Sequence, residues 1–225
     1  MSARARGVGA GIEVLPAGPG ALLVELPSGE HAEAFHAELL RRRALGELPV
    51  VREIVPGART VLLDGIADRS PDGTARLART LVSWPIPPLR RDTGNGVEIP
   101  VVYDGPDLDD VAAAWGVTVA DVPRIHAGTE FRVAFCGFAP GFGYLTGLPE
   151  HLHLPRRATP RTRVPAGALA VAGAYTGVYP RPSPGGWQLI GRMPEPGELW
   201  NPAREPAALL TPGARVRFVA AEVRP

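Results

Sequence analysis

Three segments in the second half of this sequence concentrate side chains that could do chemistry. The first, residues 137–145, holds three glycines and three aromatic residues in nine positions. Glycine lets a ligand or partner approach the backbone closely, and Tyr144 would add a hydroxyl group to such a site. The alternative is an ordered loop whose aromatic rings cover the end of a barrel. The segment does not match a dinucleotide-binding loop, because no helix pattern follows its glycines.

The second segment, residues 155–165, places four arginines between prolines: Arg156, Arg157, Arg161 and Arg163. A solvated loop is the ordinary interpretation of such a charge cluster. Proline, however, reduces the entropy that is lost when an arginine side chain clamps a carboxylate or phosphate. The segment is therefore a candidate for anion binding or for partner docking.

The third segment, residues 176–192, offers a hydroxyl, an indole, an amide and a guanidinium group: Tyr179, Trp187, Gln188 and Arg192. Successive residues of a strand point to opposite faces of the sheet. Trp187 and Gln188 therefore cannot both enter one barrel interior unless a bulge intervenes. Ser183 does not lie in a nucleophile elbow, which argues against a serine hydrolase.

Among the histidines, His126 is the best candidate for a general acid or base by residue type, and a structural hydrogen bond is the equal alternative. His31 and His36 fall on a predicted helix, where we expect them to be exposed. His151 and His153 alternate as on one face of a strand, which is a weak hint of a metal site. No set of Cys, Asp or Glu ligands lies near them, so we expect no metal.

Composition and charge exclude several functions. The net charge is +1, without the cationic excess of a nucleic-acid binder, and all 24 basic residues are arginine. The absence of lysine excludes a Walker phosphate loop and lysine Schiff-base chemistry. The single cysteine, Cys136, excludes an internal disulfide framework. No signal peptide or transmembrane run is apparent, so we expect a cytoplasmic protein that does not bind a membrane.

The first 84 residues alternate between strand and helix patterns. The predicted elements are a strand at 21–26, a helix at 30–45 capped by Gly46, a strand pair at 50–55 and 60–63, and a helix at 72–84. The order strand–helix–strand–strand–helix resembles most of a ferredoxin-like unit. Residues 85–96, rich in proline and then in Arg, Asp and Gly, form the predicted linker.

Residues 97–225 follow a different pattern, so the chain is predicted to be α+β with two domains. A strand at 97–103 precedes a short helix that Asp107 would cap and Gly116 would end. Residues 118–121 resemble a capping box that opens a second short helix. From Glu130 onward only short strands and Pro/Gly turns are legible. Repeated short strands with turn signals predict a β-barrel or sandwich.

Six short motifs of this region recur, in the same order, in one known family. They lie at 98–101, 125–127, 137–145, 160–161, 164–167 and 183–187, and residues 212–218 are similar to the closing strand of that family. The chain resembles the B subunit of 5-oxoprolinase, also called allophanate hydrolase subunit 1, a family that includes Kip-type kinase inhibitors. The resemblance covers roughly residues 10–220. The chain departs from the family pattern at Tyr175, Trp200, Met193 and Asp104, and these departures concern the choice of substrate rather than the fold.

The resemblance implies an N-terminal α/β domain and a C-terminal cyclophilin-like β-barrel. It also implies that the chain forms a heteromer with a homologue of the C subunit and acts with the A subunit. The assembled complex would use ATP to cleave 5-oxo-L-proline to L-glutamate. Two alternatives stay open: inhibition of a sensor histidine kinase, and a role in urea or allophanate metabolism.

In the enzyme, we expect a pocket at the interface between subunits, with three catalytic and three substrate-binding residues. The catalytic residues would be His126, Tyr179 and Arg192, and the substrate-binding residues Tyr144, Arg161 and Gln188.

Overall fold

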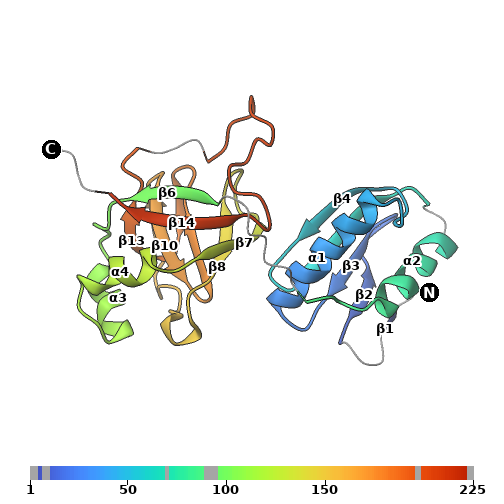
Figure 1. Ribbon diagram of the computed structural model, residues 1–225, viewed down its shortest axis with the longest axis horizontal. Helices are drawn as coiled ribbons and strands as arrows, with labels where there is room; N and C mark the ends of the chain where they lie inside the picture. The colour runs from blue at the N-terminus through green and yellow to red at the C-terminus, as the bar shows by residue number, and fades with distance from the viewer. Residues whose placement is uncertain (1–4, 7–10, 69–70, 89–95, 196–198, 222–225) are drawn as a thin grey trace. The chain divides into compact units, whose positions relative to one another are not determined.

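The computed structural model describes residues 5–6, 11–68, 71–88, 96–195 and 199–221, so most of the predicted linker lies outside the described residues. The chain divides into two compact units, Met1–Asp92 and Thr93–Pro225 (Figure 1). Within the described residues, none of the helices combines the length and apolar character that spanning a membrane requires.

The first unit is an antiparallel sheet against which two helices pack. Its strands are β1 (Ala5–Arg6), β2 (Glu13–Pro16), β3 (Leu22–Glu25), β4 (Val51–Pro56) and β5 (Thr60–Ile66), and their order in the sheet is β1-β2-β3-β5-β4. The helices are α1 (Gly29–Ala44) and α2 (Pro71–Ser83). The elements from β3 to α2 follow the predicted order. In the sheet, β3 lies between β5 and β2, and β2 precedes it in the chain. The ferredoxin-like assignment stays a prediction.

Helix α1 begins and ends where its sequence indicates. The Ser28 hydroxyl accepts a hydrogen bond from the His31 backbone N–H, and Gly46 adopts the left-handed conformation just after the helix (φ 71°). His31 is exposed as expected. The expectation for His36 was wrong: this side chain is 9% exposed, because its position faces the core that α1 forms with the sheet.

The second unit is built on a seven-stranded, nearly closed, barrel-like sheet of order β13-β10-β11-β8-β7-β14-β6. The strands are β6 (Val97–Val101), β7 (Phe131–Cys136), β8 (Gly143–Thr146), β10 (Ala168–Ala172), β11 (Tyr175–Val178), β13 (Gln188–Arg192) and β14 (Arg215–Ala220). The two end strands meet where Val102 and Arg192 exchange backbone hydrogen bonds of 2.8 Å each. The β6–β14 pair is parallel, and the other pairs are antiparallel.

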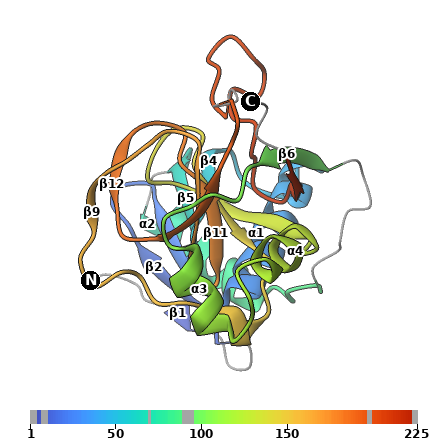
Figure 2. The same cartoon turned by 90° about the vertical axis from the view of Figure 1, so that its left-hand side faces the viewer.

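Two short helices and a small separate two-stranded sheet complete this unit. Helices α3 (Leu108–Trp115) and α4 (Asp121–Ala127) lie together, and strands β9 (Arg161–Val164) and β12 (Ser183–Gly185) pair with each other (Figure 2). Gly116 ends α3 in the left-handed conformation (φ 68°), as predicted.

The seven-stranded sheet separates two cores. On the face that we call the helix face, Leu169, Val171, Val178 and Ile190 pack with residues of α3 and α4. On the opposite face, the aromatic face, Ala168, Ala170, Ala172 and Leu189 pack with aromatic rings. The alternation along β10 produces this division, since successive side chains of a strand point to opposite faces.

Two further expectations were wrong. Asp107 stands at the start of α3, but its side chain makes no capping hydrogen bond there and instead accepts hydrogen bonds from distant segments. His151 lies in a 3-10 helix, Glu150–Leu152, which His153 ends, so the two histidines do not share a strand face. The described residues contain no group of three or more metal-ligating side chains.

Candidate active site

The aromatic face carries a continuous cluster of rings. Phe142 lies at its centre, with ring centroids 5.0 Å from Tyr144, 5.3 Å from Tyr179 and 5.5 Å from Trp187. Phe135 stacks on Tyr144 at 4.3 Å. The rings fit because β10 presents only alanines on this face, which leaves room above the sheet.

Two glycines bring the backbone against these rings. A Cβ atom at Gly177 would lie 2.9 Å from Phe142 and 3.2 Å from Trp187, and one at Gly185 would lie 2.2 Å from the Tyr179 hydroxyl. Both positions therefore require glycine for close approach rather than for backbone conformation. The Tyr179 hydroxyl lies directly over β12.

We call Tyr144, Tyr179, Arg156 and Arg161 the tyrosine–arginine group. Tyr179 is only 2% exposed, yet its hydroxyl has no hydrogen-bond partner among the described residues. Burial raises the pKa of Tyr179, and nearby Tyr144 raises it further, whereas Arg156 and Arg161 act in the opposite direction. Burial also raises the pKa of Tyr144, again against Arg156. The group thus combines protonated phenol hydroxyls with positive charge, which suits binding of a carboxylate or of a developing oxyanion.

Arg161 reaches this group from β9. In the β9–β12 pair, Arg161 lies opposite Gly185, the glycine that the Tyr179 hydroxyl approaches closely. On its other side, Arg161 Nη2 donates to Asp107 Oδ1 at 2.7 Å. Arg161 therefore links the aromatic face to the buried carboxylate of Asp107.

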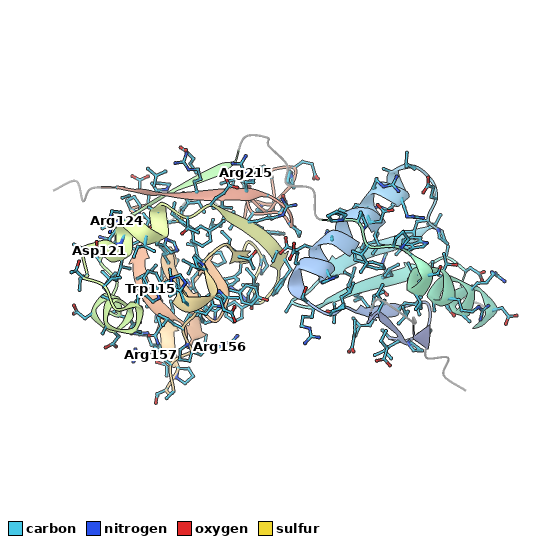
Figure 3. The ribbon with its side chains drawn as sticks, turned by 60° about the horizontal axis from the view of Figure 1, so that its bottom comes forward. Trp115, Asp121, Arg124, Arg156, Arg157 and Arg215 are labelled. Carbon is cyan, nitrogen blue, oxygen red and sulfur yellow. The ribbon has the colours of Figure 1, made fainter. Side chains whose placement is uncertain are left out.

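Asp107 receives hydrogen bonds from three segments. Its Oδ1 accepts from Arg157 Nη1 and Arg161 Nη2, each at 2.7 Å, and its Oδ2 accepts from the Leu189 backbone N–H at 2.6 Å. Burial alone would raise the pKa of Asp107, but the hydrogen bonds from Arg161 and Leu189 and the two positive charges lower it overall. Figure 3 shows Arg156 and Arg157 together at one edge of this unit, while Arg124 and Asp121 lie on α4.

Phe138 stands at the exposed side of the ring cluster. Its side chain is 58% exposed and its ring meets Phe142 at 5.4 Å and Tyr179 at 6.1 Å. Among the described residues it is the only non-glycine residue in the left-handed region (φ 65°). A bulky residue in that region carries backbone strain, a feature that clusters at functional sites.

His126 lies on the other face of the sheet, away from the tyrosine–arginine group. It is fully buried, with Nδ1 2.8 Å from the Tyr103 hydroxyl, Nε2 3.3 Å from the Thr176 hydroxyl, and its ring against Phe131 and Phe218. Burial lowers the pKa of His126 to about 3. This geometry matches the structural hydrogen bond that the sequence left open as the alternative.

The structure also separates Gln188 and Arg192 from the group. Gln188 pairs with Val171 and so faces the helix face, where its buried Oε1 has no partner among the described residues, while Trp187 belongs to the aromatic face. Arg192 stands at the seam of the barrel, where its Nε donates to Asp104 Oδ2 at 2.9 Å. Of the six predicted site residues, the structure brings together Tyr144, Tyr179 and Arg161.

Sequence reasoning missed two contributors to this region, Asp107 and Phe138. Asp107 precedes a helix pattern, which favours a cap, and only the tertiary contacts with β9 and β13 show its other role. The arginine cluster at 155–165 was a usable signal, since buried guanidinium groups need an anion nearby. Nothing in the sequence signals the backbone conformation of Phe138.

Comparison with known proteins agrees with this architecture. The family "Carboxyltransferase domain, subdomain C and D" matches residues 12–210. The chain is 45% identical over 180 residues to the B subunit of 5-oxoprolinase from Escherichia coli O157:H7, covering 78% of this chain and 80% of that protein.

Two solved structures extend the comparison. The crystal structure of TTHA0988 superposes with a TM-score of 0.71 at 38% identity, covering 92% of this chain but only 41% of that chain. The K. lactis urea amidolyase superposes with a TM-score of 0.69 at 19% identity over 97% of this chain and 15% of that one, which shows a shared fold alone. With the family match and the Escherichia coli relative taken together, this chain belongs to the carboxyltransferase subdomain C and D family, in the group of 5-oxoprolinase B subunits.

Proposed function

We propose that this chain is the B subunit of an ATP-dependent 5-oxoprolinase, which hydrolyses 5-oxo-L-proline to L-glutamate. The observation that carries the proposal is the 45% identity over four-fifths of a protein named as the B subunit of 5-oxoprolinase. The chain would act with a homologue of the C subunit and with the A subunit, in the cytoplasm. ATP is assigned to the assembled complex, and no residue of this chain is given a role in holding it.

The tyrosine–arginine group is the part of the chain that we propose to meet the substrate. The reaction opens a cyclic amide, so its carbonyl oxygen gains negative charge before water completes the cleavage. Arg161 and Arg156 would neutralise the substrate carboxylate or this oxygen, Tyr144 would bind beside them, and the Tyr179 hydroxyl would donate a proton or hydrogen bond. Tyr179 suits this role because its hydroxyl has no partner among the described residues.

The other three predicted site residues receive different roles in this proposal. His126 would be a structural residue, since both ring nitrogens already have partners in the core. Gln188 and Arg192 would contribute only if the partner protein reaches the helix face and the barrel seam. We also propose that the second unit is cyclophilin-like and that the first is a ferredoxin-like arrangement with β2 as its fourth strand.

The test is glutamate release from 5-oxoproline and ATP by this chain, co-purified with its C-type partner and supplemented with the A subunit. Turnover should vanish when this chain is omitted. Tyr179→Phe and Arg161→Ala should each lower turnover by about 10²-fold or more, as loss of a proton donor or an oxyanion partner does. If both variants retain full turnover, the site assignment is wrong while the role of the chain in the complex stands.

A further inference from the structure

We infer that Asp107 is a positioning residue of this site: it holds Arg161 in place against Tyr179 without touching the substrate. The inference rests on the proposed function and deepens it. Asp107 is 2% exposed, so its carboxylate is out of reach of a bound molecule, whereas Arg161 is 24% exposed.

The carboxylate of Asp107 is itself held rigidly. Its Oδ2 accepts the Leu189 backbone N–H at 2.6 Å, which ties it to β13. Asp107 also stands where α3 begins, and its own backbone N–H donates to the Leu189 carbonyl at 3.1 Å. Because the side chain of Asp107 is short and the residue makes two hydrogen bonds to Leu189, the carboxylate cannot rotate freely. It therefore presents Oδ1 in one fixed direction.

Arg161 and Arg157 both converge on that oxygen, each at 2.7 Å. Arginine is long and loses considerable side-chain entropy when it is fixed, so it needs a partner to hold one conformation. Two guanidinium groups and one carboxylate leave one net positive charge beside the tyrosines. The arrangement thus fixes Arg161 without neutralising the site.

The pairing with Asp107 leaves some donors of the two arginines unused. Arg161 Nη1 and Arg157 Nε are buried without a partner among the described residues. Arg161 thus keeps one donor, Nη1, that its pairing with Asp107 does not occupy.

The experiment is a double-mutant cycle in the assembled complex, measuring kcat and KM for 5-oxoproline. Asp107→Asn should lower kcat/KM by about 10²-fold through displacement of Arg161. In an Arg161→Ala background the same substitution should change kcat/KM by less than about twofold, since there is no Arg161 left to position. An undiminished effect of Asp107→Asn in that background would overturn the inference.

The matched control is Asp121→Asn. This carboxylate also pairs with an arginine at 2.7 Å, Arg124, but on α4 and apart from Arg156 and Arg157 (Figure 3). It should leave kcat/KM within about twofold of the wild type. Should Asp107→Asn fail to fold, combining it with Arg157→Ala relieves the repulsion between the two guanidinium groups, and the cycle is repeated in that background.

A second measurement does not need turnover. In ¹⁵N-labelled chain, the Nη resonances of Arg161, assigned with Arg161→Lys, should show the slow rotation of a held guanidinium group and lose it in Asp107→Asn. If the wild-type complex shows no 5-oxoproline turnover, the proposed function fails. The Nη measurement by itself then tests the positioning role of Asp107. Unchanged Nη rotation in Asp107→Asn would overturn the inference independently.

Discussion

The two faces of the barrel sheet differ in whether the polar groups of their buried side chains have hydrogen-bond partners. On the helix face, His126 is fully buried and both of its ring nitrogens lie near hydroxyl groups, those of Tyr103 and Thr176. On the aromatic face, Tyr179 is almost as deeply buried, but its hydroxyl has no partner among the described residues and lies near two arginines.

This difference teaches where function lies in the unit. A buried polar group with partners stabilises one packing of the core and has no free bonding capacity. The Tyr179 hydroxyl has no partner among the described residues and is therefore available to a ligand. Residue type alone favours histidine as the catalytic residue, yet the surroundings favour the tyrosine.

The largest expected effect is on the helix face. His126→Ala removes a packed ring and leaves two hydroxyls without their partner, so it should lower the free energy of unfolding by about 3 kcal/mol. Tyr179→Phe, which removes a hydroxyl without a partner, should change it by less than about 1 kcal/mol. Urea denaturation of both variants checks this, and equal losses would erase the contrast between the faces.

The next effect tests how tightly the aromatic face is packed. Gly177→Ala puts a methyl group 2.9 Å from Phe142 and 3.2 Å from Trp187, and should cost about 2 kcal/mol of stability through overpacking. Gly137→Ala is the matched control, because its nearest contact is 3.7 Å, to Tyr144. Thermal denaturation should separate the two, and a Gly177→Ala variant as stable as the wild type would mean that the rings move easily.

The third effect is the pH dependence of stability. The pKa of His126 is about 3 in the folded chain, lowered by burial, against an ordinary value of about 6.5. Between these values the unfolded chain binds a proton that the folded chain does not, so stability falls as pH falls below about 6.5, by at most about 1.4 kcal/mol per pH unit. His126→Gln should remove the contribution of His126 to this slope.

The measurement is urea denaturation of both proteins between pH 7 and 5. His36, whose burial lowers its pKa to about 4, gives a dependence of the same sign in the first unit, and it persists in His126→Gln. A slope that is identical in the wild type and in His126→Gln would show that His126 is accessible to protons in the folded chain.

The smallest effect is expected at the barrel seam. Asp104 and Arg192 form an ion pair at 2.9 Å with both side chains 40% or more exposed. Solvent screens such a pair, so Asp104→Asn should change the free energy of unfolding by less than about 0.5 kcal/mol. Denaturant midpoints measured beside those of His126→Ala check this. A loss above about 1 kcal/mol would mean that the closing contact of the barrel depends on this pair.

By itself the sequence determined the local structure: the periodic apolar positions placed most helices and strands, the glycines ended α1 and α3, and the ordered motifs indicated the family. These features depend on neighbours in the chain, so a pattern of residues carries them. The sequence also placed Trp187 and Gln188 on opposite faces, because the alternation of a strand is local.

Only the tertiary structure decided the rest. Whether His126 or Tyr179 has a free polar atom depends on Tyr103, Thr176 and Gly185, which the fold brings against them. The role of Asp107 likewise depends on Arg161 and Leu189, 54 and 82 positions away. Burial and partnership, which set the pKa and the bonding capacity of a side chain, are properties of the packed fold and not of residue type.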